Sequence, residues 1–202
     1  MLDRALLALL KPGFERAAST LSRAGIRADA VTLAGFALGL AAAAAIALQA
    51  FLVGLALLLA SRLADGLDGA IARHTAPTDR GAFLDITLDF LFYAVVPLAF
   101  AIADPAANAL AAAVLLAAFI GTGSSFLAFA ALAAARGKKS IAYPTKGLYY
   151  LGGLTEATET IVCFVLMCLW PQWFAALALG FAALCVVTIV MRLYAGWREL
   201  SP

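Results

Sequence analysis

Two pairs of aspartates are the residues of this sequence whose type and spacing point most directly to chemistry. Asp65 and Asp68 lie near the end of one apolar stretch, and Asp85 and Asp89 lie near the start of the next. Residues three or four positions apart share one face of a helix, with Cβ atoms about 5–6 Å apart. Each pair therefore presents two carboxylates on one side of its helix.

The connection between these two stretches is short and contains Pro77. We therefore expect the two helices to run antiparallel and side by side, with their acidic ends at the same depth. Carboxylates gathered in a pocket of low dielectric repel one another and become protonated unless cations neutralise them. Oxygen ligands without histidine or cysteine favour Mg²⁺ or Mn²⁺, and the charge suits two ions. Such a centre is suited to handling phosphates.

Glycines accompany the acids at positions 66, 69 and 81. A missing side chain lets a bulky ligand approach the backbone, and the nearby Arg73 offers a guanidinium to a diphosphate. A proton or ion pathway, or neutral acids in interhelical hydrogen bonds, would explain one acidic pair. Neither alternative accounts for the glycines, so the metal–phosphate interpretation is favoured.

The composition shows what kind of protein must position these groups. Of the 202 residues, 65% are hydrophobic and 13% are charged, and the mean hydropathy is +0.99. A soluble domain is about half apolar, so this chain has too little polar surface to cover itself in water. The net charge of +2 gives no indication of nucleic-acid binding. The sequence predicts an all-α, polytopic membrane protein.

Apolar stretches separated by short connections predict six transmembrane helices, each near the ~20 residues that a bilayer crossing needs. They cover residues 31–48, 52–71, 82–103, 109–135, 148–169 and 173–194. Twelve of the 14 basic residues lie before the first stretch, after the sixth, or in the second-to-third and fourth-to-fifth connections, and none lies in the other three connections. The remaining two, Arg62 and Arg192, lie within the second and sixth stretches. By the positive-inside rule, both termini and the aspartates are cytoplasmic. We expect a multi-pass protein of a bacterial inner membrane.

Residues 1–30 differ from the rest because basic and apolar side chains alternate there. This mixture predicts an amphipathic juxtamembrane helix in the lipid headgroup region, and a soluble amphipathic lead-in is the alternative. Residues 31–202 then form the six-helix transmembrane catalytic domain. The three cysteines lie in apolar stretches without metal-ligand spacing, so we interpret them as small buried hydrophobic residues.

The acidic residues form part of a longer pattern. It reads Asp65-x2-Asp68-Gly69-x2-Ala72-Arg73, then Gly81-x3-Asp85-x3-Asp89. This pattern resembles the signature of the CDP-alcohol phosphatidyltransferases, and the six spans and the N-terminal amphipathic segment are similar too. Two features depart from that family. The gap between arginine and second glycine is one residue shorter than usual, and Asp29-Ala-Val-Thr32 stands where many members have Asn-x-x-Thr.

The resemblance implies transfer of a phosphatidyl group from CDP-diacylglycerol to a small hydroxylated acceptor, with release of CMP, in phospholipid biosynthesis. Asp89 would be the catalytic general base. The metal ligands would be Asp65, Asp68, Asp85 and Asp89. The residues along the nucleotide would be Thr32, Asp65, Gly66, Gly69, Ala72, Arg73 and Gly81.

The acceptor is sought among the later spans. Glycerol 3-phosphate is the first choice because a basic cluster offers cations for its phosphate. That cluster is Arg136, Lys138, Lys139 and Lys146. It serves equally well as a topology signal or as a site for anionic lipid headgroups. Inositol, serine, another polyol or phosphatidylglycerol remain alternative acceptors. Glu156 and Glu159 share a helix face, where they bind the acceptor or pair with a buried arginine such as Arg62 or Arg192.

Three further alternatives follow from the sequence. From another functional class, a membrane cation transporter would use the aspartates as its path, and a non-catalytic scaffold would simply bind metal there. The small-residue patches Gly35-x3-Gly39 and 121–125 allow close helix approach, either within the bundle or in a homodimer. His74 is expected to be solvated in a loop.

Overall fold

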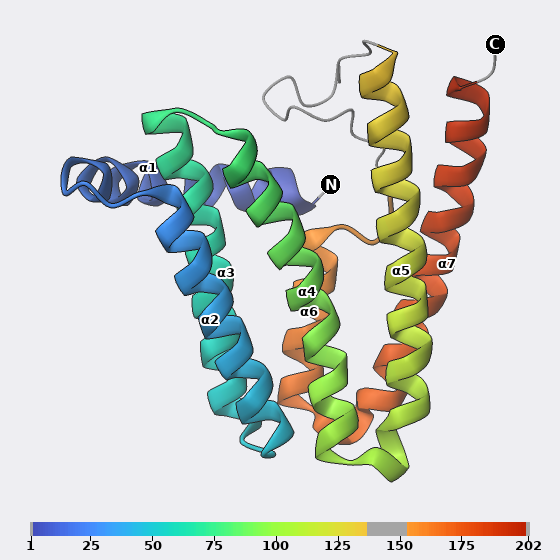
Figure 1. The fold of residues 1–202 in the computed structure, drawn as a ribbon. Helices are drawn as coiled ribbons and strands as arrows, with labels where there is room; N and C mark the ends of the chain where they lie inside the picture. Colours follow the sequence, from blue (N-terminus) through green and yellow to red (C-terminus); the bar gives the residue numbers. More distant parts are fainter. Residues whose placement is uncertain (1, 137–152, 201–202) are drawn as a thin grey trace.

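The computed structural model describes residues 2–136 and 153–200 of the chain, all of it helical apart from short connections. The helices in this part of the chain are α1 (Leu2–Arg23), α2 (Ala28–Ala47), α3 (Phe51–Thr75), α4 (Asp79–Ala103), α5 (Pro105–Ala135), α6 (Ala157–Leu169), the single 3₁₀ turn η1 (Pro171–Trp173) and α7 (Phe174–Glu199). Figure 1 shows α2, α3, α4, α5 and α7 running side by side, with α1 lying across one end of the bundle.

The helix contacts divide the bundle into two packed groups. Helix α2 packs against both α3 and α4, α5 packs against α7, and α4 connects the groups by also packing against α5. The backbones of α3 and α4 come close to each other at few points. The predicted meeting of the acidic ends is confirmed, but close packing of the two helices is not, because α2 lies against both. Helices α3 and α4 meet through long side chains, at Arg62 with Asp89 and, at the opposite end, at Phe51 with Phe100.

Glycines explain how α2 comes so close to its neighbours. A Cβ at Gly35 would lie 3.0 Å from Ala64 Cβ on α3, and one at Gly39 would lie 2.7 Å from the Phe92 ring on α4. The two glycines of segment 121–125 are equally confined, since a Cβ on them would lie 2.4 and 2.6 Å from side chains of α7 and α4. Both patches are thus used for packing within the bundle. A homodimer stays a prediction.

The helix bounds agree with the predicted spans except in the fifth. Helix α6 begins at Ala157 and not at residue 148, because residues 153–156 are not helical and 148–152 lie outside the described part. A capping box starts the helix: the Glu156 N–H donates to the Glu159 carboxylate at 3.2 Å. The N–H groups of residues 154 and 155 both donate to the Thr188 hydroxyl on α7.

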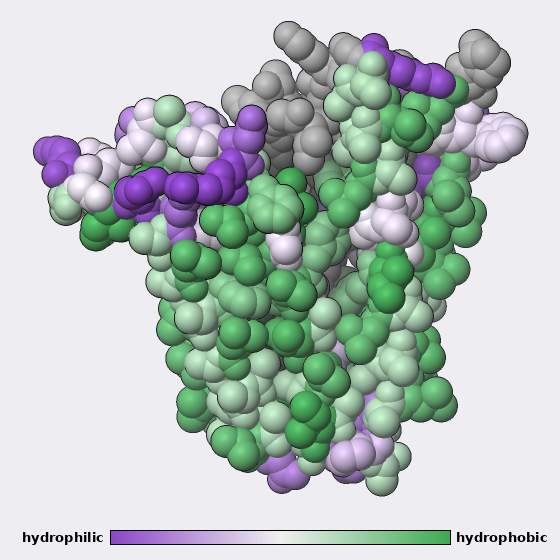
Figure 2. Space-filling model, viewed as in Figure 1, coloured by the Kyte–Doolittle hydropathy of each residue, from purple (hydrophilic) through white to green (hydrophobic). Residues whose placement is uncertain are grey.

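The described helices form an all-α membrane fold, as predicted. Four segments are long and apolar enough to cross a bilayer: α2, α4, α5 and residues 171–199. Helix α3 does not qualify because Arg62, Asp65 and Asp68 interrupt its apolar surface, and α6 has only 13 residues. The count of six crossings therefore stays a prediction. Figure 2 shows a broad hydrophobic band across this face of the bundle, with hydrophilic residues over α1 and the nearby helix ends and a few at the opposite end.

Stacked aromatic rings close the bundle at the end remote from α1, which we call the aromatic end. The Phe100 ring of α4 stacks on Phe174 at 4.6 Å and on Phe51 at 5.7 Å between ring centroids. Gln49, in the turn between α2 and α3, donates from its side-chain amide to the Ala103 carbonyl at 2.8 Å. This end joins α3, α4 and α7 through apolar burial.

The opposite end, where α1 lies, we call the polar end. Ala18 of α1 is fully buried against Ala70 and Ile71 of α3, and Phe14 packs beside them. This small apolar cluster holds α1 across the end of α3. Four turns of helix, about 22 Å, separate the two ends along α4 from Asp85 to Phe100.

Candidate active site

Three carboxylates converge at the polar end. Asp65 and Asp68 of α3 and Asp85 of α4 each offer a carboxylate oxygen, and these oxygens lie within 4.8 Å of one another. Asp68 is only 5% exposed, and its Oδ2 has no hydrogen-bond partner among the described residues. A buried carboxylate oxygen without a partner is costly unless a cation satisfies it. The set of hard oxygens therefore fits a divalent cation such as Mg²⁺ or Mn²⁺.

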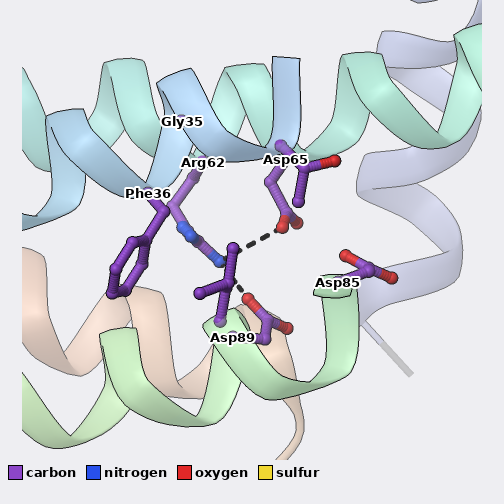
Figure 3. A pocket seen from close by; sticks show the side chains of 8 residues that line it. Gly35, Phe36, Arg62, Asp65, Asp85 and Asp89 are labelled. Carbon is purple, nitrogen blue, oxygen red and sulfur yellow. Dashed lines mark hydrogen bonds and ion pairs between the residues drawn. The ribbon is translucent and has the colours of Figure 1, made fainter. Parts of the chain in front are cut away.

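Asp89 lies one turn further along α4 and is held differently. Its carboxylate accepts a hydrogen bond from Arg62 Nη1 at 2.5 Å, and the same nitrogen lies 3.6 Å from Asp65 Oδ1. Figure 3 shows the Arg62 guanidinium between these two carboxylates, with Asp85 on the far side of Asp65. Asp89 is not a member of the group of three. Its role as a metal ligand stays a prediction.

The surroundings of this cluster fix its geometry. The Arg62 guanidinium lies over the Phe92 ring, 3.8 Å from the centroid, and its side chain is 11% exposed. Next to it lies a cavity of about 10 Å³, roughly the room of one water molecule or ion. The residues lining the cavity are Thr32, Gly35, Phe36, Arg62, Asp65, Asp85, Leu88 and Asp89. Thr32, expected near the nucleotide, thus faces the same cavity as the aspartates.

The glycines of the pattern have different surroundings. A Cβ at Gly66 would lie 2.8 Å from the Phe14 ring, so this glycine makes room for α1. A Cβ at Gly69 would meet only Arg73 Nη1 at 3.6 Å, so the surface there is open to a ligand. At Gly81 a Cβ would lie 3.3 Å from Asp29 Oδ1. Only Gly69 has the open surroundings expected of a glycine beside a bound nucleotide.

Arg73 and His74 contact α1. Glu15 Oε1 lies 3.4 Å from Arg73 Nη2, and Glu15 Oε2 lies 2.7 Å from His74 Nε2. Partial burial acts to raise the pKa of Glu15, but hydrogen bonds from His74 and Arg73 outweigh it, so the pKa lies below its ordinary value. His74 therefore contacts a helix rather than standing free in a loop, and Ala72 is half-buried beside this pair.

The turn between α3 and α4 is tied to the start of α2. Thr78 caps α4 by accepting the Gly81 N–H at 3.0 Å. Asp29 accepts a hydrogen bond from Arg80 and lies 3.9 Å from Arg27. Asp29, the departure from the expected asparagine, thus serves as an anchor for this turn.

The predicted acceptor residues are only partly described. Arg136 is exposed at the end of α5, whereas Lys138, Lys139 and Lys146 lie outside the described residues. Glu156 and Glu159 form the capping box of α6. Arg192 donates to the Thr122 carbonyl at 2.9 Å. Acceptor binding by any of these residues stays a prediction.

Sequence reasoning missed the role of Arg62. It treated this arginine as a topology signal or as a partner for a glutamate, whereas the structure pairs it with Asp65 and Asp89. A signal was present, because Arg62 lies three residues before Asp65 and hence on the same helix face. A basic residue inside an apolar stretch normally has an acidic partner.

The family can now be identified. A sequence model described as CDP-alcohol phosphatidyltransferase matches residues 26–191 of this chain. The chain belongs to the CDP-alcohol phosphatidyltransferase family. The matched region contains the aspartate cluster, the glycines and Arg73, so the site described above is the one that carries the signature of the CDP-alcohol phosphatidyltransferases. The chain is accordingly a phosphotransferase for substituted phosphate groups.

Two proteins of known name are similar to the chain in sequence. It is 54% identical over 201 residues to the inner membrane protein YnjF of Escherichia coli strain K12, an alignment that covers 100% of this chain and 98% of YnjF. It is also 49% identical over 70 residues to the archaetidylinositol phosphate synthase of Methanothermobacter thermautotrophicus, covering 34% of this chain and 36% of that protein.

Solved structures show the same fold. The phosphatidylinositol phosphate synthase PgsA1 of Mycobacterium tuberculosis, crystallised with CDP-DAG bound, matches with a TM-score of 0.72 and 24% identity, over 91% of this chain and 93% of PgsA1. A second crystal structure of PgsA1, in complex with manganese and citrate, matches with a TM-score of 0.71 and 24% identity, over 91% of this chain and 88% of PgsA1.

Proposed function

We propose that this enzyme transfers a phosphatidyl group from CDP-diacylglycerol to a small hydroxylated acceptor and releases CMP. The observation that carries the proposal is the convergence of Asp65, Asp68 and Asp85 beside the open surface at Gly69. A divalent cation held by these carboxylates would neutralise charge on the diphosphate and on departing CMP. The PgsA1 structures with CDP-DAG and with manganese support this donor and this cofactor.

The residues of the chain account for each remaining part of the reaction. Asp89 accepts the proton of the acceptor hydroxyl, whose oxygen then forms a bond to the β-phosphorus of the donor. The bond from that phosphorus to the bridging oxygen breaks, and the electron pair leaves with CMP. Arg73, one turn beyond Gly69, exchanges Glu15 for the diphosphate and stabilises its charge.

We place the active site and both termini on the cytoplasmic side of a bacterial inner membrane. The distribution of basic residues supports this orientation, and the inner-membrane relative YnjF supports the compartment. The donor then keeps its acyl chains in the lipid while its nucleotide reaches the polar end. Helix α1 lies in the headgroup region in this arrangement.

Two acceptors are proposed for testing first. Glycerol 3-phosphate is favoured by the cations that follow α5, beginning with Arg136. An inositol phosphate is the second candidate because two of the similar proteins are synthases of phosphorylated inositol lipids.

Release of CMP from CDP-diacylglycerol by the purified protein tests the proposal. We expect release with Mg²⁺ or Mn²⁺ and one acceptor of a panel that includes glycerol 3-phosphate, inositol 1-phosphate, inositol and serine, and no release with EDTA. Asp89→Asn should lower turnover by about 10²–10⁴-fold while retaining donor binding, as expected for loss of a general base. The absence of CMP with every acceptor, together with metal flux in liposomes, would favour a cation transporter instead.

A further inference from the structure

Glu15 of α1 contacts two side chains of α3 through a single carboxylate. Its Oε1 lies 3.4 Å from Arg73 Nη2, and its Oε2 lies 2.7 Å from His74 Nε2. Helix α1 lies across this end of the bundle (Figure 1), which brings the carboxylate to the last turn of α3. Two oxygens of a phosphate group could bind the same two nitrogens. Arg73 and His74 therefore form an anion site that a side chain of the protein occupies.

This anion site borders the surface at which the nucleotide is proposed to lie. A Cβ at Gly69 would meet only Arg73 Nη1, at 3.6 Å, so the guanidinium lies beside open surface. The side chains of Glu15, Arg73 and His74 are 33%, 54% and 38% exposed, so a ligand can reach all three. A diphosphate at Gly69 and the carboxylate of Glu15 thus compete for the same guanidinium.

Glu15 can leave the anion site without detaching α1 from the bundle. Helix α1 is held on α3 by an apolar cluster, in which Ala18 is fully buried beside Ala70 and Ile71 and Phe14 packs against them. These apolar contacts do not involve the carboxylate, so they persist when its side chain turns away. Because ion pairs between partly exposed groups are weak, little free energy is needed to release Glu15.

We infer that Glu15 is an internal competitor of CDP-diacylglycerol, and that His74 extends the anion site of Arg73. In the substrate-free protein the Glu15 carboxylate occupies both side chains, and a bound diphosphate takes them over. The identity of the competing anion rests on the proposed function, whereas the existence of an occupied anion site does not. Glu15 therefore stabilises the contact between α1 and α3 and at the same time lowers the affinity for CDP-diacylglycerol.

Isothermal titration of the purified full chain with CDP-diacylglycerol in mixed micelles, with Mg²⁺ and without acceptor, tests this inference. Glu15→Gln should bind about three- to tenfold more tightly than the wild type, because partly exposed ion pairs no longer have to be broken on binding. The control Asp79→Asn removes the same charge from the exposed first turn of α4 and should bind as the wild type does. Equal or weaker binding by Glu15→Gln would overturn the inference, because loss of a purely structural glutamate does not raise affinity.

A double variant isolates the contribution of His74. In the wild type, loss of His74 weakens both the carboxylate and the diphosphate at the anion site, so the two effects partly cancel. In Glu15→Gln the competitor is absent, and adding His74→Gln should weaken binding of CDP-diacylglycerol about three- to tenfold, as expected for loss of one hydrogen bond to a charged group. Unchanged binding in the double variant would remove His74 from the site.

Inorganic pyrophosphate separates this inference from the proposed function. In EDTA it probes the anion site without a metal ion and without acyl chains. It should bind Glu15→Gln more tightly than the wild type, and equal binding, or binding to neither protein, would overturn the inference. If CDP-diacylglycerol binds to no variant while pyrophosphate prefers Glu15→Gln, the proposed function fails and the internal competitor stands.

Discussion

The two ends of the bundle are built on different principles. The aromatic end gathers Phe51, Phe100 and Phe174 in stacked contact, and apolar burial joins its helices. The polar end has a smaller apolar cluster under α1, and its other contacts are ion pairs, caps and a buried carboxylate. The comparison indicates that apolar packing away from the polar end supplies most of the stability of the fold, which leaves the polar end free to hold groups that oppose folding.

The largest effect that tests this division is loss of a carboxylate at the polar end. Asp68→Asn should reduce CMP release about 10³-fold or more, because the cation it binds contributes several kcal/mol to the transition state. It should also weaken Mn²⁺ binding while leaving the Tm unchanged or higher. Asp79→Asn removes an exposed acid from the first turn of α4 and serves as the control. Unchanged Mn²⁺ affinity in Asp68→Asn would contradict its role as a ligand.

At the aromatic end we expect a substitution to lower the stability of the protein and to leave its specific activity unchanged. Phe100→Ala should lower the free energy of unfolding by about 3 kcal/mol, because it opens a cavity between two stacked rings. Thermal unfolding in detergent measures the change, and CMP release per folded molecule should stay near that of the wild type. Leu98→Ala, at a side chain 48% exposed on the same helix, is the matched control with little effect. A loss of specific activity in Phe100→Ala would show that the two ends are coupled.

Within the polar end, two glycines in one turn of α3 should differ in whether they affect stability or donor binding. Gly66→Ala should destabilise the protein by about 1 kcal/mol, because the Phe14 ring must move aside. Gly69→Ala has space for its methyl group and should leave stability unchanged or slightly raised, while it raises KM for the donor. Thermal unfolding and steady-state kinetics on both variants measure the two effects. If Gly66→Ala and Gly69→Ala changed the thermal stability and the KM for the donor in the same way, the two glycines would not have the different roles given to them here.

The smallest effect concerns pH at the contact between α1 and α3. Because its partners lower the pKa of Glu15, the stabilisation is present above the ordinary carboxyl pKa of 4.5 and is lost as pH falls through the lowered value. Limited proteolysis of α1 should therefore increase slightly below about pH 4.5 in the wild type. In Glu15→Gln the cleavage rate should be higher at neutral pH and should depend less on pH in this range. Equal pH dependence in both proteins would rule out Glu15 as the cause.

Much of this architecture could be predicted from sequence because apolar stretches and glycine–aspartate spacing are local signals. The helix ranges and the convergence of Asp65, Asp68 and Asp85 follow from such signals. Contacts that depend on three-dimensional neighbours could not be predicted. These include α2 lying against both α3 and α4, and Phe14 filling the space above Gly66.

The first residue of α6 could not be predicted from the sequence either. Apolar composition continues through residues 148–156, so composition alone extends the helix too far. The capping box of Glu156 and Glu159 decides where the helix starts, and it also gives these carboxylates a local use that their spacing alone did not reveal.

The short α6 has a consequence for how the bundle meets its surroundings. Its 13 residues extend only about 20 Å, against roughly 30 Å of hydrocarbon in a bilayer. The preceding peptide groups at 154 and 155 are satisfied by Thr188, a side chain of another helix. Backbone of this kind is not tolerated against acyl chains, so that flank must be turned inward or wetted. Thr155 and Thr188 are both buried, so this segment is turned inward, and a neighbouring helix takes the place of solvent for the peptide groups that precede α6.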